Sequence, residues 1–248
     1  MVKDDIIQHI VTNEFKDFDI FTLYAQFVKE NGLTLFTGCG KFMRLLDDIS
    51  QLNDIQNVSR LAPSILMDRA RKFDRHFRYE NTFARSFYEY VLSRLKNGDK
   101  VWDIGCGEHP LNTMYLNEQG VDITGIDPCI NTKFVEYFGL KYKRAVIQSL
   151  EQSIQEENPS MLIGFRPCDG QEHLIRLAQK YDKSIITKAC DCRLFTPDKQ
   201  IIRGEADKTN YFLSKYPFLK RGSMFATQED SDKLSSETCL DTVMEAYR

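Results

Sequence analysis

The sequence predicts an α/β protein, with a mostly parallel sheet that has helices on both faces and is preceded by a helical N-terminal unit. Two patterns support this prediction. Up to about residue 97, apolar side chains recur at spacings of three and four, the helical period. From residue 99, short apolar runs alternate with helical stretches, as in sheets whose parallel strands are joined by crossover helices. The length of 248 residues suits one large domain, or one domain with a smaller appendage.

The first half of the chain is expected to be helical throughout. Apolar residues at helical spacing predict helices around residues 6–11, 21–28, 41–52, 63–78 and 81–96. Asn31-Gly32 and Asn97-Gly98 follow two of these stretches and are typical helix-ending pairs. Residues 1–97 are therefore assigned to a helical N-terminal unit, either a substrate platform or a lid over a pocket.

The second half is expected to form the sheet. Five apolar runs predict its strands, namely KVWDIG, VDITGID, KRAVIQ, MLIGF and SIITKAC. The helices between them are expected at about 111–119, 131–139, 149–157 and 170–181, each long enough to join two parallel strands. The tail, 231–248, has helical spacing but equally fits a segment that flanks a strand. Residues 98–248 are therefore assigned to one α/β domain.

Composition excludes several protein classes. With 42% hydrophobic and 28% charged residues, the chain is neither disordered nor collagen-like, and its net charge of −3 does not indicate a polybasic nucleic-acid binder. Apolar runs stay below the roughly 18–20 residues of a membrane span, and the first residues lack a secretory signal, so a cytoplasmic location is expected. Seven cysteines, an odd number, favour reduced thiols over a disulfide framework, although one oxidised pair is left open.

The segment 101–110, VWDIGCGEHP, predicts a binding site. An apolar strand runs into Gly105-Cys106-Gly107, and Pro110 stands where the first turn of a helix is expected. Two glycines allow a tight turn and a close approach of a ligand to the backbone, and the next helix then presents its free amides to a polar or anionic group. The second strand ends in Asp127, 24 residues after Asp103, where a carboxylate is able to hold both hydroxyls of a ribose.

Two cofactor classes use such an arrangement. Dinucleotide enzymes have a third glycine for close packing of helix and strand, and Pro110 occupies its place here, which disfavours a nicotinamide cofactor. The segment instead resembles motif I of class I S-adenosylmethionine-dependent methyltransferases, in which an acidic strand residue precedes a glycine-rich loop. Asp127 is similar to the acidic residue that ends the second strand of this family. An α/β protein with an incidental Asp127 is the alternative.

The resemblance covers about residues 98–192 and implies a Rossmann-like fold, the cofactor S-adenosyl-L-methionine and the transfer of its methyl group. It implies that the loop Gly105–Gly107, including Cys106, faces the methionine moiety, that Asp103 orders this loop, and that Asp127 holds the ribose. The family offers an acid or amide to the adenine amino group from its third motif. The segment 145–152, AVIQSLEQ, has no clear aspartate, and Gln148 is expected there, with Ser149 and Glu151 as alternatives.

The acceptor is expected beside the loop that follows the fourth strand. In the family that this chain resembles, the loop lies next to the transferred methyl group, and here it contains Arg166 and Asp169, the two residues expected to be catalytic. Methyl transfer is an in-line displacement that depends mainly on alignment, and a base, Asp169 or His173, is needed only if the acceptor must lose a proton. Asp169 also has a structural interpretation, as the N-cap of the helix over 170–181, and the sequence favours it.

Three cysteines and a histidine in the second half of the chain resemble a zinc-ligand set, but their spacing disfavours a zinc site. Cys168, His173, Cys190 and Cys192 lie after neighbouring strands, but Cys190 and Cys192 are separated by one residue, whereas structural zinc sites usually have two to four residues between paired ligands. Most of these thiols are expected to be small buried hydrophobic groups, and no metal is predicted.

RNA, ribosomal or transfer RNA, is the acceptor favoured by a small margin. Residues 60–96 carry nine Lys/Arg and four Asp/Glu, a net charge of +5. Arg71, Arg75 and Arg78 are interleaved with aromatic residues, a mixture that contacts phosphates and stacks on bases, and 215–225 is similar. For the first patch, the alternative is a solvated helix face whose aromatic side chains enter the core. For the acceptor, the alternative is a small molecule or a protein. For the whole protein, the alternative is a non-catalytic cofactor-binding module with a protein partner. The oligomeric state is not predicted.

Overall fold

The computed structural model describes residues 2–11, 19–34, 37–52, 62–196, 201–224 and 242–247. The chain divides into two compact units, Met1–Thr82 and Phe83–Arg248, which meet inside one long helix, α5 (Ala62–Arg94). The two helices predicted over 63–78 and 81–96 are parts of this single helix, because neither proline nor glycine interrupts the segment between them. The sequence predicted a boundary at residue 97, whereas residues 83–94 pack with the sheet.

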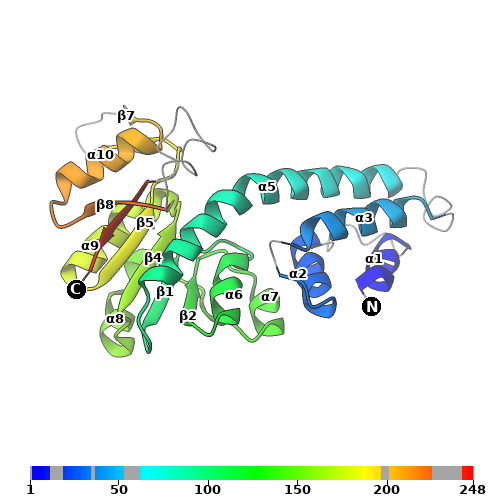
Figure 1. Ribbon diagram of the computed structural model, residues 1–248, viewed down its shortest axis with the longest axis horizontal. Helices are drawn as coiled ribbons and strands as arrows, with labels where there is room; N and C mark the ends of the chain where they lie inside the picture. Colours follow the sequence, from blue (N-terminus) through cyan, green and yellow to red (C-terminus); the bar gives the residue numbers. More distant parts are fainter. Residues whose placement is uncertain are drawn as a thin grey trace. The chain divides into compact units, whose positions relative to one another are not determined.

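The N-terminal unit is helical, as predicted (Figure 1). It contains α1 (Val2–Val11), α2 (Ile20–Glu30), α3 (Cys39–Ser50) and the first part of α5. Asp19 caps α2, because its Oδ1 accepts the backbone N–H groups of Phe21 and Thr22 at 3.1 and 3.2 Å. The core is aromatic, with ring centroids of Tyr24, Phe42 and Phe73 between 5.1 and 5.7 Å apart.

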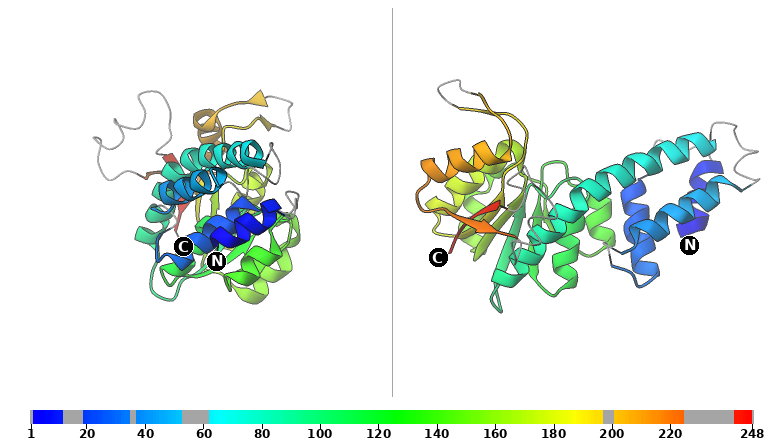
Figure 2. Two further views of the ribbon diagram at one scale, coloured as in Figure 1. Left: turned by 90° about the vertical axis from the view of Figure 1, so that its right-hand side faces the viewer. Right: turned by 45° about the horizontal axis from the view of Figure 1, so that its top comes forward.

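The C-terminal unit is built on a seven-stranded sheet with the order β3-β2-β1-β4-β5-β9-β8 (Figures 1 and 2). Its parallel strands are β1 (Lys100–Ile104), β2 (Asp122–Ile126), β3 (Lys141–Lys143), β4 (Met161–Phe165) and β5 (Ser184–Lys188). β9 (Thr242–Ala246) is antiparallel to β5 and to β8 (Lys220–Ser223). A two-stranded pair, β6 (Leu194–Phe195) and β7 (Ile201–Ile202), lies apart from this sheet. The predicted mostly parallel, Rossmann-like sheet is confirmed.

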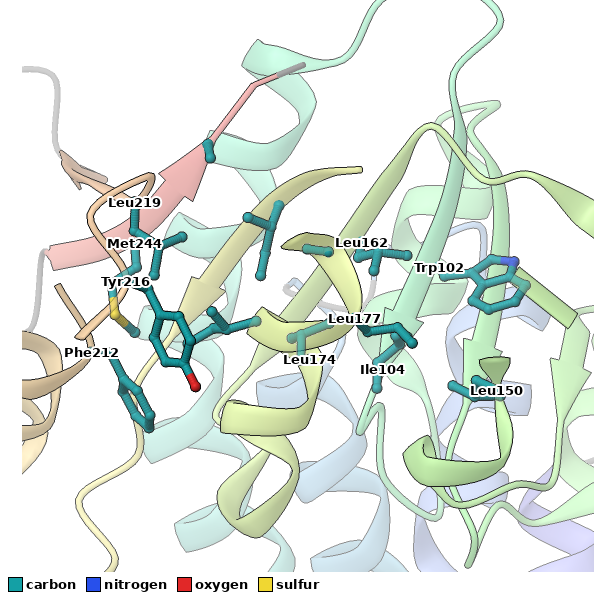
Figure 3. Packing of buried hydrophobic residues seen from close by; sticks show 14 of the residues in the cluster. Trp102, Ile104, Leu150, Leu162, Leu174, Leu177, Phe212, Tyr216, Leu219 and Met244 are labelled. Carbon is teal, nitrogen blue, oxygen red and sulfur yellow. The ribbon is translucent and has the colours of Figure 1, made fainter. Parts of the chain in front are cut away.

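Helices cover both faces of the sheet, because neighbouring strand residues point to opposite sides. On one face, Trp102, Leu162 and Ile185 pack under α8 (Glu151–Glu157), α9 (Gln171–Lys180) and α10 (Glu205–Lys215), as Figure 3 shows for part of this cluster. On the other face, Val101, Ile163 and Ile186 pack under the end of α5 and under α6 (Leu111–Glu118). α7 (Thr132–Tyr137) joins β2 to β3.

One sequence prediction of secondary structure is wrong, and one open alternative is decided. The third strand was expected within KRAVIQ, 143–148, but β3 ends at Lys143, and Val146 in the predicted run is 50% exposed. β3 lies at the edge of the sheet and pairs with β2 alone, so apolar side chains near it are not required to be buried. In the tail the sequence left open a helix and a segment that flanks a strand, and in the structure Val243 and Met244 belong to the strand β9. Both are fully buried, on opposite faces of the sheet, as in a strand covered on both sides. Residues 225–241 lie outside the described residues.

None of the helices in the described ranges is long and apolar enough to cross a lipid bilayer.

Candidate functional site

The sheet order itself predicts where a ligand binds. From β1 the chain proceeds outward through β2 to β3, and it then returns to β4 on the other side of β1. The loop after β1 leads to α6 on one face, whereas the loop after β4 leads to α9 on the other. Such a switch point opens a crevice at the carboxyl ends of the two strands, and ligands of open α/β sheets bind there.

The glycine loop Gly105–Gly107 lies at this switch point. Gly105 and Gly107 have φ values of +77° and +85°, a left-handed conformation that favours glycine. A Cβ atom added at Gly105 would lie 3.0 Å from the Cβ of Pro167, so the loop after β4 packs closely against this glycine. At Gly107 an added Cβ would meet no atom within 4 Å. A ligand can therefore approach the backbone at Gly107, whereas Pro167 covers the backbone at Gly105.

Asp127, the first residue after β2, joins the two loops. Its Oδ2 accepts the Gly107 backbone N–H at 3.0 Å, and its Oδ1 accepts the Cys129 N–H at 2.8 Å. The side chain is half-buried, and each carboxylate oxygen has two lone pairs, which leaves acceptor capacity toward a ligand. Asn131 strengthens the connection, because its backbone N–H donates to the carbonyl of Glu108 at 2.8 Å. The predicted juxtaposition of Asp127 and the glycine loop is present.

Asp103 lies below the loop rather than in it. It is fully buried, and its Oδ2 accepts the hydroxyls of Thr113 at 2.7 Å and Tyr88 at 3.0 Å. Its Oδ1 has no hydrogen-bond partner among the described residues. Burial raises the pKa of this carboxyl to about 6; the two hydroxyls oppose the rise, and the charge of Asp127 adds to it. Asp103 therefore orders the start of α6 through Thr113, and its fully buried side chain is not exposed to a ligand.

Cys106 is not placed for nucleophilic chemistry. An added Cβ at Gly125 would lie 3.2 Å from the Cys106 Sγ, so this sulfur is turned inward over β2. Burial, followed by the charges of Asp103 and Asp127, raises the pKa of the Cys106 thiol well above its usual value. Its backbone still forms part of the glycine loop.

Pro110 precedes α6, and the adenine candidates follow β3. Pro110 was expected in the first turn, but it is the N-cap, one residue before the helix begins at Leu111, and it offers no side-chain hydrogen bond. Gln148 is exposed in a short 3-10 helix (Ile147–Ser149) and makes no hydrogen bond to other described residues. Ser149 instead donates to the Val146 carbonyl at 2.8 Å, and Glu151 forms an ion pair with Lys180 on α9. Gln148 is therefore the candidate of the three whose side chain is not already engaged.

The residues expected near the acceptor have different environments. The loop after β4 is strained, because Arg166 and Cys168 are non-glycine residues with φ values of +53° and +44°. Asp169 is exposed in a one-turn 3-10 helix, and the N-cap of α9 is Gly170, without a side-chain hydrogen bond. The prediction that Asp169 caps this helix is therefore wrong, because the helical turn already begins at Cys168. His173 is exposed on α9.

Arg166 points into the protein and ties α10 to the sheet. Its guanidinium forms an ion pair with Glu205 Oε1, and Lys188 Nζ lies 2.9 Å from Glu205 Oε2, an ionic contact without hydrogen-bond geometry. All three side chains are at most 9% exposed. Arg166 is thus a positioning residue in this structure, and it holds the first turn of α10 over the ends of β4 and β5.

A sulfur cluster lies beside this ionic group. The Sγ atoms of Cys168, Cys190 and Cys192 are all within 4.8 Å of one another, and a disulfide joins Cys190 to Cys192. The general expectation of reduced thiols is thus wrong for this pair, although the sequence left one oxidised pair open. Lys208 of α10 is 2% exposed, and its Nζ lies 3.1 and 3.0 Å from the Sγ atoms of Cys190 and Cys192.

The two basic and aromatic patches bury part of their aromatic surface. Arg71 is exposed, but the side chains of Arg75 and Arg78 lie outside the described residues, as do those of Phe77 and Tyr79. Phe73 is 1% exposed in the core of the N-terminal unit, and Tyr216 of the second patch is 7% exposed. These two rings are therefore not available for stacking on bases, in line with the alternative that the aromatics enter the core.

Comparisons with known proteins find similar solved structures at low sequence identity. No family model matches the chain, and no curated protein sequence matches it. Among solved structures, the chain is similar to the plantazolicin methyltransferase BpumL in complex with SAH, at 13% identity over 73% of this chain and 91% of that chain, with a TM-score of 0.44. MtNAS in complex with MTA and tNA is 14% identical over 99% and 97% of the two chains, with a TM-score of 0.42.

WbdD, a bifunctional kinase-methyltransferase, is 15% identical over 69% of this chain, with a TM-score of 0.43, and the match spans 41% of that longer chain. The mostly parallel seven-stranded sheet with helices on both faces is a Rossmann-like arrangement. Because all three TM-scores are below 0.5, the assignments that follow rest on this chain's own residues.

Several site residues have no counterpart in the sequence predictions. Each contacts a residue that is distant in the sequence. Tyr88 and Thr113 donate hydrogen bonds to Asp103, Glu205 forms ion pairs with Arg166 and Lys188, and Lys208 contacts Cys190 and Cys192. One signal was available, because Lys188 ends an otherwise apolar strand, where a lysine is rarely buried without a partner.

Proposed function

We propose that residues 83–248 bind S-adenosyl-L-methionine at the carboxyl ends of β1 and β2 and transfer its methyl group to an acceptor. One observation carries this proposal: the carboxylate of Asp127 is half-exposed and is fixed by the Gly107 N–H at 3.0 Å, next to open backbone. A fixed carboxylate beside a left-handed glycine loop provides acceptors for a ribose diol and space for the attached chain.

The residues present fit this cofactor. Asp127 holds the two ribose hydroxyls with the acceptor capacity that its two backbone contacts leave free. Gly107 admits the ligand because its α-carbon faces open space, whereas Pro167 over Gly105 closes the other side of the loop. Gln148 offers an amide at the end of the third motif, where both a donor and an acceptor serve an adenine. When bound, the cofactor supplies an electrophilic methyl group on a sulfonium.

The protein's part in the transfer is alignment rather than bond-making chemistry. Displacement at a methyl group needs the acceptor in line with the leaving sulfur, and the strained loop after β4 provides a rigid wall for this purpose. Pro167 and Arg166 fix that wall, the first against Gly105 and the second through Glu205. Asp169 is exposed beside it and takes the proton of an acceptor that must lose one.

Within this proposal, RNA is the acceptor to test first. The net charge of +5 over residues 60–96 favours phosphate contacts, and Arg71 is exposed for them. The burial of Phe73 and Tyr216 removes two stacking rings, so recognition would depend on phosphates and would weaken steeply with salt. A small-molecule or protein acceptor is the competing outcome.

Calorimetry with purified, ligand-free protein tests the cofactor. We expect wild-type protein to bind S-adenosylmethionine, and Asp127→Ala to weaken binding about 100-fold, because two hydrogen bonds to a charged acceptor contribute ~3 kcal/mol together. Asp122→Ala is the matched control, since Asp122 begins the strand that Asp127 follows and its exposed carboxylate contacts Lys141. No binding by the wild type, or equal binding by wild type and Asp127→Ala, contradicts the proposal.

Methyl labelling tests the acceptor. Cofactor with a radiolabelled methyl group is incubated with protein and with cell RNA, cell protein or small-molecule extract, and each fraction is counted. Label in RNA that disappears with Asp127→Ala and falls steeply with salt supports the RNA proposal. Label in another fraction alone replaces RNA as the acceptor while leaving the methyltransferase proposal intact.

A further inference from the structure

Three cysteine sulfurs meet where the loops after β4 and β5 lie side by side. The two strands are parallel neighbours, paired from Met161 with Ser184 to Phe165 with Lys188, so their carboxyl ends share one edge of the sheet. The Sγ atoms of Cys168, Cys190 and Cys192 lie within 4.8 Å of one another. A tetrahedral zinc ion with Zn–S bonds of about 2.3 Å places its sulfur ligands roughly 3.8 Å apart. In this structure two of the three sulfurs, those of Cys190 and Cys192, are bonded to each other, and reduction of that bond would leave three thiols close enough to reach one ion.

The partner of these sulfurs is a buried cation. Lys208 is 2% exposed, and its Nζ lies 3.1 Å from the Cys190 Sγ and 3.0 Å from the Cys192 Sγ. A buried ammonium requires strong acceptors, and the sulfur of a thiol or a disulfide is a weak one. Thiolates, free or bound to a metal, are the sulfur species that satisfy it.

Charge balance around the cluster also favours anionic sulfur. Arg166, Lys188 and Lys208 are buried cations, and the buried carboxylate that the described residues place among them is Glu205. With Cys190 and Cys192 as a disulfide, these four buried side chains carry two surplus positive charges. The carboxylates of Asp191 and Asp169 also act on Lys208, but from exposed positions. Three thiolates around a divalent ion add one net negative charge and lower that surplus.

A metal ion explains why three thiolates tolerate one another. Anionic sulfurs less than 5 Å apart repel each other, and a bound cation removes this repulsion. Soft thiolate ligands in a tetrahedral arrangement select zinc among the common divalent ions of cells. In the described part of the chain the cluster has three ligands, and Cys168 is exposed, so the fourth position faces solvent.

We propose that Cys168, Cys190 and Cys192 bind one zinc ion in the reduced protein, with Lys208 donating to two of the sulfurs and a fourth position open to solvent. The disulfide is the oxidised, metal-free form of the same site. A dithiol reductant supplies two electrons and two protons, which break the Cys190–Cys192 bond into two thiols and leave the reductant as a disulfide. Zinc then displaces the protons of three thiols, and they pass to the solvent.

Zinc titration of the full chain tests the proposal. Reduced protein, freed of reductant without air, is titrated with zinc against a chromogenic zinc indicator. Cobalt(II) is titrated in parallel, because its thiolate charge-transfer band reports sulfur ligands directly. We expect one metal per chain in the reduced protein and none in the protein kept oxidised. No metal uptake after reduction, or equal uptake by both forms, overturns the proposal.

Variants assign the ligands. Cys168→Ser and Cys192→Ser should each abolish stoichiometric zinc binding and weaken the cobalt band, whereas Cys129→Ser should leave both unchanged. Cys129 is the matched control, since it is an exposed free cysteine after β2. Lys208→Met should weaken zinc binding about 10–100-fold, as the loss of groups that support metal ligands does. If Cys168→Ser folds with an unchanged circular dichroism spectrum and binds zinc like the wild type, the three-cysteine site is refuted.

Discussion

Replacing Asp103 by asparagine should stabilise the protein at neutral pH, by an amount that grows as the pH rises. The carboxyl is fully buried, it accepts two hydroxyls through Oδ2, and its Oδ1 has no partner among the described residues. Burial without full compensation raises its pKa from 3.8 to about 6. Burial thus disfavours the charged carboxylate. An asparagine carries no charge, and its amide oxygen still accepts the hydroxyls of Thr113 and Tyr88.

The size of the effect follows from linkage. When the folded-state pKa of an acid is raised, the unfolded chain releases its proton first, so stability falls with rising pH between about 4 and 6 and is level above. A rise from 3.8 to about 6 corresponds to roughly 3 kcal/mol of stability lost at pH 7. Asp103→Asn should recover up to ~3 kcal/mol at pH 7.5 and about 1 kcal/mol at pH 4.5.

Urea unfolding followed by circular dichroism, at several pH values from 4.5 to 7.5, measures this difference. Wild type and Asp103→Asn are compared at each pH, so that the titration of other groups cancels. Asp122→Asn is the control, because Asp122 is exposed on β2 and its replacement should give no such pH-dependent gain. A stability difference that is independent of pH, or an asparagine variant that is less stable at pH 7.5, would refute the reasoning.

Two further predictions concern the loops around the switch point. Gly105→Ala should destabilise the protein, because the new Cβ would lie 3.0 Å from Pro167 and the residue would keep a φ of +77°. Glu205→Ala should cost ~3–5 kcal/mol of unfolding free energy in urea titrations, since it leaves Arg166 and Lys188 buried without their shared carboxylate.

Matched controls separate these causes. Gly120→Ala has a similar φ of +82° but no atom within 4 Å of its new Cβ, so Gly105→Ala should exceed its cost by ~1–3 kcal/mol. Equal costs for the two glycines would show that contact with Pro167 is unimportant. Glu151→Ala, which removes an exposed ion pair with Lys180, should change stability little, and an effect as large as that of Glu205→Ala would contradict the role of burial.

The glycine loop and its acid were predictable because their signals are local. Gly105 and Gly107 are required by left-handed backbone, and Asp127 follows a strand whose register with β1 is fixed by apolar pairing. The third strand was misplaced because an edge strand buries too little to impose a pattern. Asp169 was misassigned as a cap because helix ends are uncertain by one or two residues.

The sequence by itself determined the two kinds of architecture, the parallel strands and the position of the glycine loop. These follow from residue periodicity and from backbone conformations that neighbouring residues fix. Only the tertiary structure decided that Tyr88 reaches Asp103, that Glu205 neutralises Arg166, and that three cysteines meet beside Lys208. The physical reason is that charge and hydrogen-bond partners are chosen by distance in space, and the fold brings together residues that are 15 to 39 positions apart in the chain.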